Sequence, residues 1–215
     1  MTDYETARNK MVDNQIRTTD VTSHSVLKAF LAVPREAFVA DALKPLAYID
    51  NDIEFAPGRY MLEPSPLAKL LQAAGITRND TVLEIGCGAG YTAALLSHLA
   101  AGVVAVESDE ALAASAKAAL AGYDNVVVVS GDMEKGHAAE GPYDLVFVNG
   151  AVEEVPSALL DQLRDGGRLI AVVGYGNAAY ATLFTKERGA ISSTVQFNCS
   201  IRPLPGFRKA KEFVF

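Results

Sequence analysis

The 215-residue sequence contains no tryptophan and only two cysteines, Cys87 and Cys199. Two cysteines are too few for a disulfide-stapled fold, and they are typical of a reducing compartment. The first ten residues, MTDYETARNK, have no apolar core of the signal-peptide type. No apolar run approaches the roughly 18–20 residues that a membrane-spanning helix needs. The sequence therefore predicts a cytoplasmic protein that makes no membrane contact.

An excess of positive charge is also missing. The formal net charge is −7, which disfavours broad binding to the phosphate backbone of a nucleic acid. The only basic concentration lies near the end of the chain and is interpreted as a solvated terminus: Arg202, Arg208, Lys209 and Lys211. The histidines lie far apart and lack the spacing of metal ligands: His24, His98 and His137. We therefore expect neither a nucleic-acid partner nor a metal site.

The first 66 residues predict a helical segment followed by an irregular loop. Apolar residues recur at helical spacing through residues 1–45, with Pro34 as an interruption. Residues 46–66 are rich in proline and predict a loop that crosses toward a site. We expect this N-terminal segment to join a core at residues 67–215 in one compact domain.

From residue 67 the pattern alternates between helices and short, continuously apolar strands. Strands are predicted at 81–85, 103–107, 126–130, 145–149 and 168–173, and helices at 67–74, 91–99, 109–120 and 156–163. Ser108 is the expected N-cap of the helix at 109–120. Two extended segments, Ala181–Lys186 and Thr194–Ser200, predict an antiparallel pair at the C-terminal edge. The fold class is α/β, with a doubly wound, Rossmann-like, mostly parallel sheet and helices on both faces.

The most specific signal is a glycine loop between the first of these strands and the helix at 91–99. Gly86, Gly88 and Gly90 are spaced by two residues. Glycine permits a tight turn, lets a ligand approach the backbone closely, and allows a helix to pack near a strand. The dinucleotide pattern G-x-G-x-x-G would need a glycine where this chain has Tyr91.

A carboxylate beside the loop distinguishes between two cofactor classes. Glu84 precedes the first glycine by two residues and would oppose the pyrophosphate of a dinucleotide. S-adenosylmethionine has no phosphate and carries an ammonium and a sulfonium. The spacing E-x-G-x-G-x-G therefore favours S-adenosylmethionine over a nicotinamide cofactor, with Cys87 as a small filler in the loop.

Polar residues at the ends of the following strands suit the same nucleoside. Glu107 is expected to accept both ribose hydroxyls, Asp132 to accept the adenine amine, and Met133 to pack on the adenine ring. Asn149 ends the fourth strand beside the loop. Taken singly, Glu107 could end a solvated strand, and Asp132 and Asn149 could each mark a turn. The predicted cofactor-binding residues are Glu84, Gly86, Cys87, Gly88, Gly90, Tyr91, Glu107, Ser108, Asp132 and Met133.

Ordered segments along nearly the whole chain resemble the protein-L-isoaspartate O-methyltransferase family. They resemble VPRE-x-FV, AY-x-D, VLEIG-x-G-x-GY, GY-x-NV, GD, PYD and QLK-x-GGRLV-x-x-VG, at residues 33–39, 47–50, 82–91, 122–126, 131–132, 142–144 and 162–174. The resemblance implies a small enzyme that methylates the α-carboxylate of isoaspartyl residues in damaged proteins. It implies a modified order of the end strands, and cofactor contacts from Glu84, Gly86, Gly88, Glu107 and Asp132.

The substrate loop departs from the family segment G-x-Q-T-I-S-Q-P. The family serine falls on Leu62, which cannot donate a hydrogen bond. The following glutamine falls on Glu63, whose charge would repel a carboxylate. The family glycine after GD is Met133, and the family segment T-A-A-A-P falls on residues 149–153. The cofactor half of the family pattern is thus intact, whereas the acceptor half is rewritten.

Three hypotheses follow for the function. The preferred one is methylation of an isoaspartyl carboxylate, in a protein or peptide, or of a related small carboxylate; the acid is already ionised at neutral pH and needs no general base. A second is a methyltransferase with a different acceptor, and a third is a cofactor-binding protein without catalysis. The predicted acceptor-site residues are Tyr60, Leu62, Glu63 and Asn149, with Arg59 and backbone amides near Pro64 orienting the acceptor. A monomer is expected.

Overall fold

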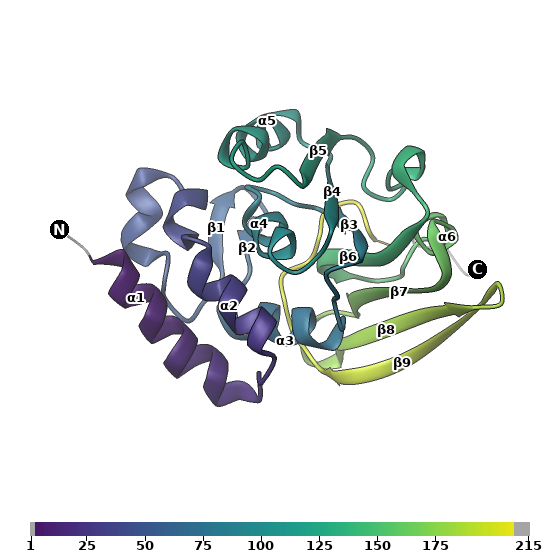
Figure 1. The fold of residues 1–215 in the computed structure, drawn as a ribbon, viewed down its shortest axis with the longest axis horizontal. Coiled ribbons are helices and arrows are strands. Elements are labelled where there is room, and N and C mark those ends of the chain that lie inside the picture. Colours follow the sequence, from purple (N-terminus) through teal and green to yellow (C-terminus); the bar gives the residue numbers. More distant parts are fainter. Residues whose placement is uncertain (1–2, 209–215) are drawn as a thin grey trace, which may run out of the picture.

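A seven-stranded sheet forms the centre of the computed structural model, which describes residues 3–208 (Figure 1). Its strands are β3 (Thr81–Ile85), β4 (Gly102–Glu107), β5 (Val126–Ser130), β6 (Tyr143–Val152), β7 (Leu163–Val173), β8 (Tyr180–Glu187) and β9 (Ala190–Asn198). Their order is β5-β4-β3-β6-β7-β8-β9. The strands β3 to β7 are parallel to one another, whereas β8 is antiparallel to both of its neighbours, β7 and β9. The predicted parallel sheet with an antiparallel C-terminal edge is confirmed.

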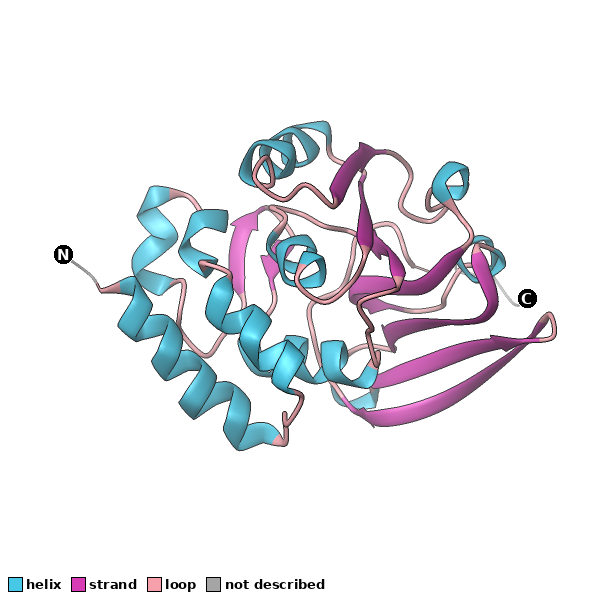
Figure 2. Cartoon of the chain, viewed as in Figure 1, coloured by secondary structure: helices cyan, strands magenta, loops and turns pink. Residues whose placement is uncertain are grey.

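The α-helices lie mainly in the N-terminal half of the described chain (Figure 2). They are α1 (Tyr4–Met11), α2 (His24–Ala32), α3 (Pro64–Ala73), α4 (Tyr91–Ser97), α5 (Glu110–Ala119) and α6 (Ser157–Asp161). A π-helical turn, Val12–Ile16, continues α1, and short 3₁₀ turns follow α2 at Arg35–Phe38 and Asp41–Leu46. The N-terminal segment is thus helical, as predicted. The basic residues Lys209 and Lys211 lie outside the described residues.

Both faces of the sheet are buried at its centre, along β3, β4 and β6, which explains why these strands are almost continuously apolar, whereas the edge strand β9 is exposed. On one face Val82 and Phe147 belong to the same apolar cluster as Phe30 of α2. On the other face Leu83 packs with Leu159 of α6 and with Leu204 of the C-terminal segment. The predicted helices on both faces are present, although the second face carries only the short α6. The division of the chain at residue 66 stays a prediction.

Residues 46–66 are more regular than the sequence analysis predicted. β1 (Ile53–Ala56) and β2 (Arg59–Met61) pair as an antiparallel hairpin outside the main sheet. Pro57 and Gly58 form its turn, with a φ of +69° at the glycine. Pro64 opens α3 at a first-turn position, where the missing N–H of proline costs nothing. The prolines therefore punctuate a hairpin and a helix start, and the predicted irregular loop is wrong.

The predicted N-cap of α5 is also wrong by one residue. The Asp109 side chain, and not that of Ser108, accepts from the amides of Ala111 and Leu112, at 2.9 and 3.0 Å. Serine and aspartate are both good N-caps, so local preference does not distinguish the two neighbours. Ser108 is exposed and free to face the site.

Candidate functional site

The glycine loop between β3 and α4 has three left-handed backbone positions. The φ angles of Gly86, Gly88 and Gly90 are +82°, +55° and +94°, a region that favours glycine. A Cβ on Gly90 would lie 2.9 Å from Leu120 Cδ1, so this glycine allows α5 to pack closely. The amide of Gly86 donates to the Val106 carbonyl at 2.9 Å, which ties the loop to the end of β4.

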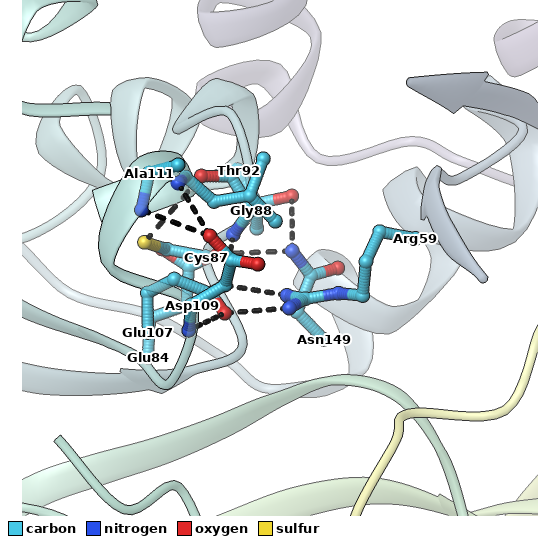
Figure 3. A network of polar contacts seen from close by, with 10 residues as sticks. Arg59, Glu84, Cys87, Gly88, Thr92, Glu107, Asp109, Ala111 and Asn149 are labelled. Carbon is cyan, nitrogen blue, oxygen red and sulfur yellow. Dashed lines mark hydrogen bonds and ion pairs between the residues drawn. The ribbon is translucent and has the colours of Figure 1, made fainter. Parts of the chain in front are cut away.

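Glu107 ends β4 with a fully buried carboxylate directly below this loop. Its two oxygens accept from the two terminal nitrogens of Arg59, each at 2.5 Å (Figure 3). Gly88 N and Asp109 N donate to the same carboxylate at 2.8 and 3.1 Å. Burial alone would raise the pKa of Glu107, but the hydrogen bonds and charge of Arg59 and the backbone amides outweigh it and lower that pKa. A charged, four-fold hydrogen-bonded carboxylate therefore ends β4.

Glu84 and Asn149 form a second polar group on the other side of the loop (Figure 3). Asn149 Nδ2 donates to Glu84 Oε1 at 3.0 Å and to Thr92 Oγ1 at 3.1 Å. Burial raises the pKa of Glu84 to about 8, although the Asn149 hydrogen bond opposes this shift. Among the described residues no donor reaches Glu84 Oε2 or Asn149 Oδ1. Two buried oxygen atoms beside the glycine loop thus lack a hydrogen-bond donor, and a cationic ligand group could supply one.

The residues predicted for adenine lie together at the far end of the site. Ser108, Asp132 and Met133 line one cavity of ≈ 340 Å³. The Asp132 carboxylate is exposed and lies 3.0 Å from Lys135 Nζ, whereas the Met133 side chain is buried. The carboxyl ends of β4 and β5 bring these residues side by side, as parallel strands must.

The space directly over the glycine loop is filled by the β1–β2 hairpin. A Cβ on Gly88 would lie only 2.5 Å from Phe55 Cζ, so the phenyl ring occupies the room that the glycine leaves. Two cavities remain beside the loop, and both are lined by Tyr60 and Asn149. Each holds ≈ 10 Å³, barely the room for one water. The residue types fit S-adenosylmethionine, and in this conformation Phe55 occupies the room over Gly88 where its sugar would lie.

Comparison with known proteins identifies the family. A model of the protein-L-isoaspartate(D-aspartate) O-methyltransferase family matches residues 6–208. A Koribacter versatilis protein-L-isoaspartate O-methyltransferase is 37% identical over 208 residues, which are 96% of this chain and 94% of the relative. A relative of the same name from Methanoculleus marisnigri is 38% identical over 201 residues, 93% of this chain and 91% of its own. The chain belongs to the protein-L-isoaspartate(D-aspartate) O-methyltransferase family. The predicted enzyme class, an S-adenosylmethionine-dependent O-methyltransferase, is confirmed by this membership.

Solved structures carry the same fold. A protein-L-isoaspartate O-methyltransferase structure superposes with a TM-score of 0.81 at 30% identity, covering 93% of this chain and 66% of that structure. A Plasmodium falciparum structure in complex with S-adenosyl-L-homocysteine gives a TM-score of 0.79 at 18% identity, covering 95% of this chain and 99% of that structure. The predicted fold class is confirmed by both likenesses.

The rewritten substrate loop of this family member contributes little to the open surface. Leu62 is buried, and its carbonyl accepts from the buried Arg35 at 2.8 Å. Burial and the charges of Asp50 and Asp52 raise the pKa of Glu63. Glu63 lines neither of the two small cavities. Of the four predicted acceptor residues, the structure therefore brings Tyr60, Leu62 and Asn149 to the glycine loop and leaves Glu63 aside.

Cys87 and Tyr91 both line one of the small cavities beside the glycine loop, and both side chains are otherwise buried. Burial raises the pKa of the Cys87 thiol well above its usual range, which disfavours the reactive thiolate and agrees with the prediction that this cysteine is a small filler in the loop. The Tyr91 ring packs edge-on against Phe38, with ring centroids 5.7 Å apart, and beneath the Arg35 guanidinium at 4.9 Å. Tyr91 therefore anchors the glycine loop to the N-terminal helices through its side chain.

Sequence reasoning missed two residues of the site, Phe55 and Arg202, and did not predict the partner of Arg59. Phe55 and Arg59 reach the site from the hairpin, and the guanidinium of Arg59, which was predicted to orient the acceptor, pairs with Glu107. Arg202, read as part of a solvated terminus, places its guanidinium 4.8 Å from the centre of the Tyr60 ring. The signal in the sequence for the pairing with Glu107 was Arg59 itself, a charged residue in the rewritten loop. Among the described residues, no helix has the length and apolarity to cross a membrane, and no three acidic, histidine or cysteine side chains gather as a metal site.

Proposed function

We propose that this chain transfers a methyl group from S-adenosylmethionine to a protein or peptide carboxylate, with the α-carboxylate of an isoaspartyl residue as the acceptor. The observation that carries the proposal is the glycine loop with Glu84 and Glu107 on either side, in a chain that matches the family over residues 6–208. The names of the relatives support the same acceptor. The two buried carboxylates beside the loop, Glu84 and Glu107, would oppose the pyrophosphate of a dinucleotide.

Each part of the site has a proposed task toward the cofactor. Glu84 Oε2 and Asn149 Oδ1 would accept the ammonium, because both are buried and lack a donor. Glu107 would accept the ribose hydroxyls once Arg59 has left it, and Asp132 would accept the adenine amine. The cofactor, when bound, supplies an electrophilic methyl group.

The protein part of the chemistry is orientation and desolvation. The acceptor carboxylate is ionised at neutral pH, so the chain needs no base to activate it. Holding the attacking oxygen at ~3 Å from the methyl carbon, in line with the leaving sulfur, contributes roughly 7–11 kcal/mol to lowering the barrier. Tyr60 and Arg202, which line the same small cavity as Asn149, are the proposed orienting groups. The Arg202 guanidinium is half exposed, and its Nε pairs with Asp52 at 3.1 Å, so its terminal nitrogens are the groups proposed to bind the acceptor carboxylate.

A labelling experiment tests the proposal. The purified chain is incubated with methyl-labelled S-adenosylmethionine and an isoaspartyl peptide, and base-labile label in the peptide is counted. The matched control is the same peptide with a normal aspartyl residue. Label that depends on the isoaspartyl linkage supports the proposal, whereas donor binding without transfer to this peptide contradicts the proposed acceptor.

Two further expectations belong to this proposal. We propose a cytoplasmic location, which the free and buried thiols of Cys87 and Cys199 support. We also propose that the enzyme acts as a monomer, because the glycine loop, Glu84, Glu107 and Asp132 all come from one chain.

A further inference from the structure

One short hairpin occupies both features that would receive the cofactor sugar. Phe55, on β1, fills the space above Gly88, and Arg59, on β2, pairs with Glu107. Arg59 is 8% exposed and Glu107 is fully buried, so the pair is shielded from water. The two contacts come from residues on either side of a single turn, and a single movement of that turn would release both.

Arg59 offers Glu107 the same hydrogen-bonding pattern as a ribose diol. A guanidinium presents two parallel N–H donors to the two carboxylate oxygens, and a vicinal diol presents two O–H donors to the same pair. Gly88 N and Asp109 N already use one further site on each oxygen. Arg59 and the sugar therefore cannot satisfy Glu107 in the same position at the same time.

The hairpin is built so that its tip can move while its base stays in place. At the base, Ile53 and Met61 pair with each other and are buried in the N-terminal core. The tip, Pro57–Gly58, is exposed, and the hairpin pairs with no strand of the main sheet. A two-stranded hairpin is marginally stable on its own. Displacing the tip breaks the contacts of Phe55 and Arg59 and leaves the buried base intact.

The arginine is a feature of this chain and not of the family segment. Counting back from Leu62 along G-x-Q-T-I-S-Q-P, Arg59 stands where the segment has its first glutamine. A neutral glutamine cannot form the charged, two-fold contact that Arg59 makes with Glu107. The family residue therefore supplies a natural test substitution.

We infer that the tip of the β1–β2 hairpin, through Arg59 and Phe55, closes over the sugar site and competes with the cofactor for Glu107. The inference rests on the proposed function, since it assigns Glu107 to the ribose of S-adenosylmethionine. Cofactor binding then requires the tip to open, and the observed affinity is reduced by the fraction of molecules that are open. Arg59 thus sets the affinity for the cofactor without itself contacting it.

Calorimetric titration with S-adenosylhomocysteine tests the competition. Arg59→Gln restores the family residue and removes the charged pair, and we expect it to bind at least about tenfold more tightly than the wild type. Arg59→Lys keeps the charge but loses the two-fold geometry, and its affinity should lie between these two. Arg17→Gln is the matched control, because it removes an exposed arginine that pairs with Asp13 of the same helical segment and not with Glu107. Its affinity should equal that of the wild type.

The titration distinguishes a failure of the proposed competition by Arg59 from a failure of the proposed function. If wild type and Arg59→Gln bind S-adenosylhomocysteine equally, or the variant binds more weakly, the competition is refuted while cofactor use stands. If neither protein binds at millimolar ligand, the proposed function fails and the competition fails with it.

Hydrogen exchange on the wild type gives a test that does not depend on a variant folding. Addition of S-adenosylhomocysteine should speed amide exchange in the hairpin, residues 53–61, and slow it in the glycine loop, residues 86–90. Slower or unchanged exchange in the hairpin, together with protection of the glycine loop, would overturn the inference, because the ligand would then bind beneath a hairpin that has not opened.

Discussion

Replacing Glu84 by glutamine should stabilise the folded protein at alkaline pH, and the gain should shrink as the pH falls. Burial raises the pKa of Glu84 to about 8 from its ordinary 4.5. Between these two values the folded state holds a proton that the unfolded state has released. The free energy of unfolding therefore falls as the pH rises through this window. Glutamine carries no charge at any pH and avoids this loss.

The size of the effect follows from the two pKa values. Each pKa unit corresponds to 1.36 kcal/mol, so the carboxyl costs roughly 4 kcal/mol at pH 8 as an upper figure and almost nothing at pH 4.5. The shape of the side chain is unchanged, and Asn149 Nδ2 can still donate to the remaining oxygen. In the variant an amide nitrogen replaces Glu84 Oε2, which is one of two buried acceptors without a donor. The new nitrogen can donate to the other, Asn149 Oδ1.

Urea unfolding at pH 5 and at pH 8.5 measures this difference. We expect Glu84→Gln to exceed the wild type in unfolding free energy by a few kcal/mol at pH 8.5 and by much less at pH 5. Glu187→Gln, at the exposed end of β8, is the matched control and should shift neither value. A variant that is equally stable or less stable than the wild type at pH 8.5 would refute the reasoning. Ionisation of the buried Glu84 would then not lower the free energy of unfolding.

Three further predictions concern the same site. Binding of S-adenosylhomocysteine at pH 7 should release a proton from Glu84, measured as a dependence of the calorimetric heat on buffer ionisation that Glu84→Gln lacks. Gly88→Val should lose ligand binding and about 1–3 kcal/mol of stability, because valine is strained at a φ of +55° and collides with Phe55. Glu107→Gln should lower the unfolding free energy by about 3–5 kcal/mol, because Arg59 is left buried without its carboxylate, and urea unfolding as stable as the wild type would contradict that contact.

The sequence was sufficient for the centre of the main sheet because the strands there are buried on both faces. A strand such as Val103–Glu107 is continuously apolar for this reason, and the glycine loop and the helix after it follow in a fixed order. The carboxyl ends of parallel strands meet at one edge, so Glu107, Asp132 and Asn149 could be assigned to one region without any knowledge of side-chain contacts.

The hairpin and its contacts could not be predicted from local sequence. Pro57 and Gly58 are equally typical of an irregular loop and of a hairpin turn. The partner of Arg59 lies 48 residues away, and only the folded chain brings the two together. The sequence correctly placed Glu107 as a carboxylate at the end of a strand. It could not show that Arg59 of the same chain pairs with that carboxylate.

The same contacts change how the rewritten loop should be interpreted. From sequence, its substitutions suggest a new acceptor. In the structure two of these substituted residues make contacts inside the protein. Leu62 is buried in the N-terminal core, and Arg59 is paired with Glu107. Of the substituted loop residues, Tyr60 lines both small cavities beside the glycine loop, and the guanidinium that lies over its ring, from Arg202, comes from the C-terminal segment. We therefore propose that Tyr60 and Arg202 take the place of the family serine in binding the acceptor, because a cation at Arg202 favours an anionic acceptor such as a carboxylate.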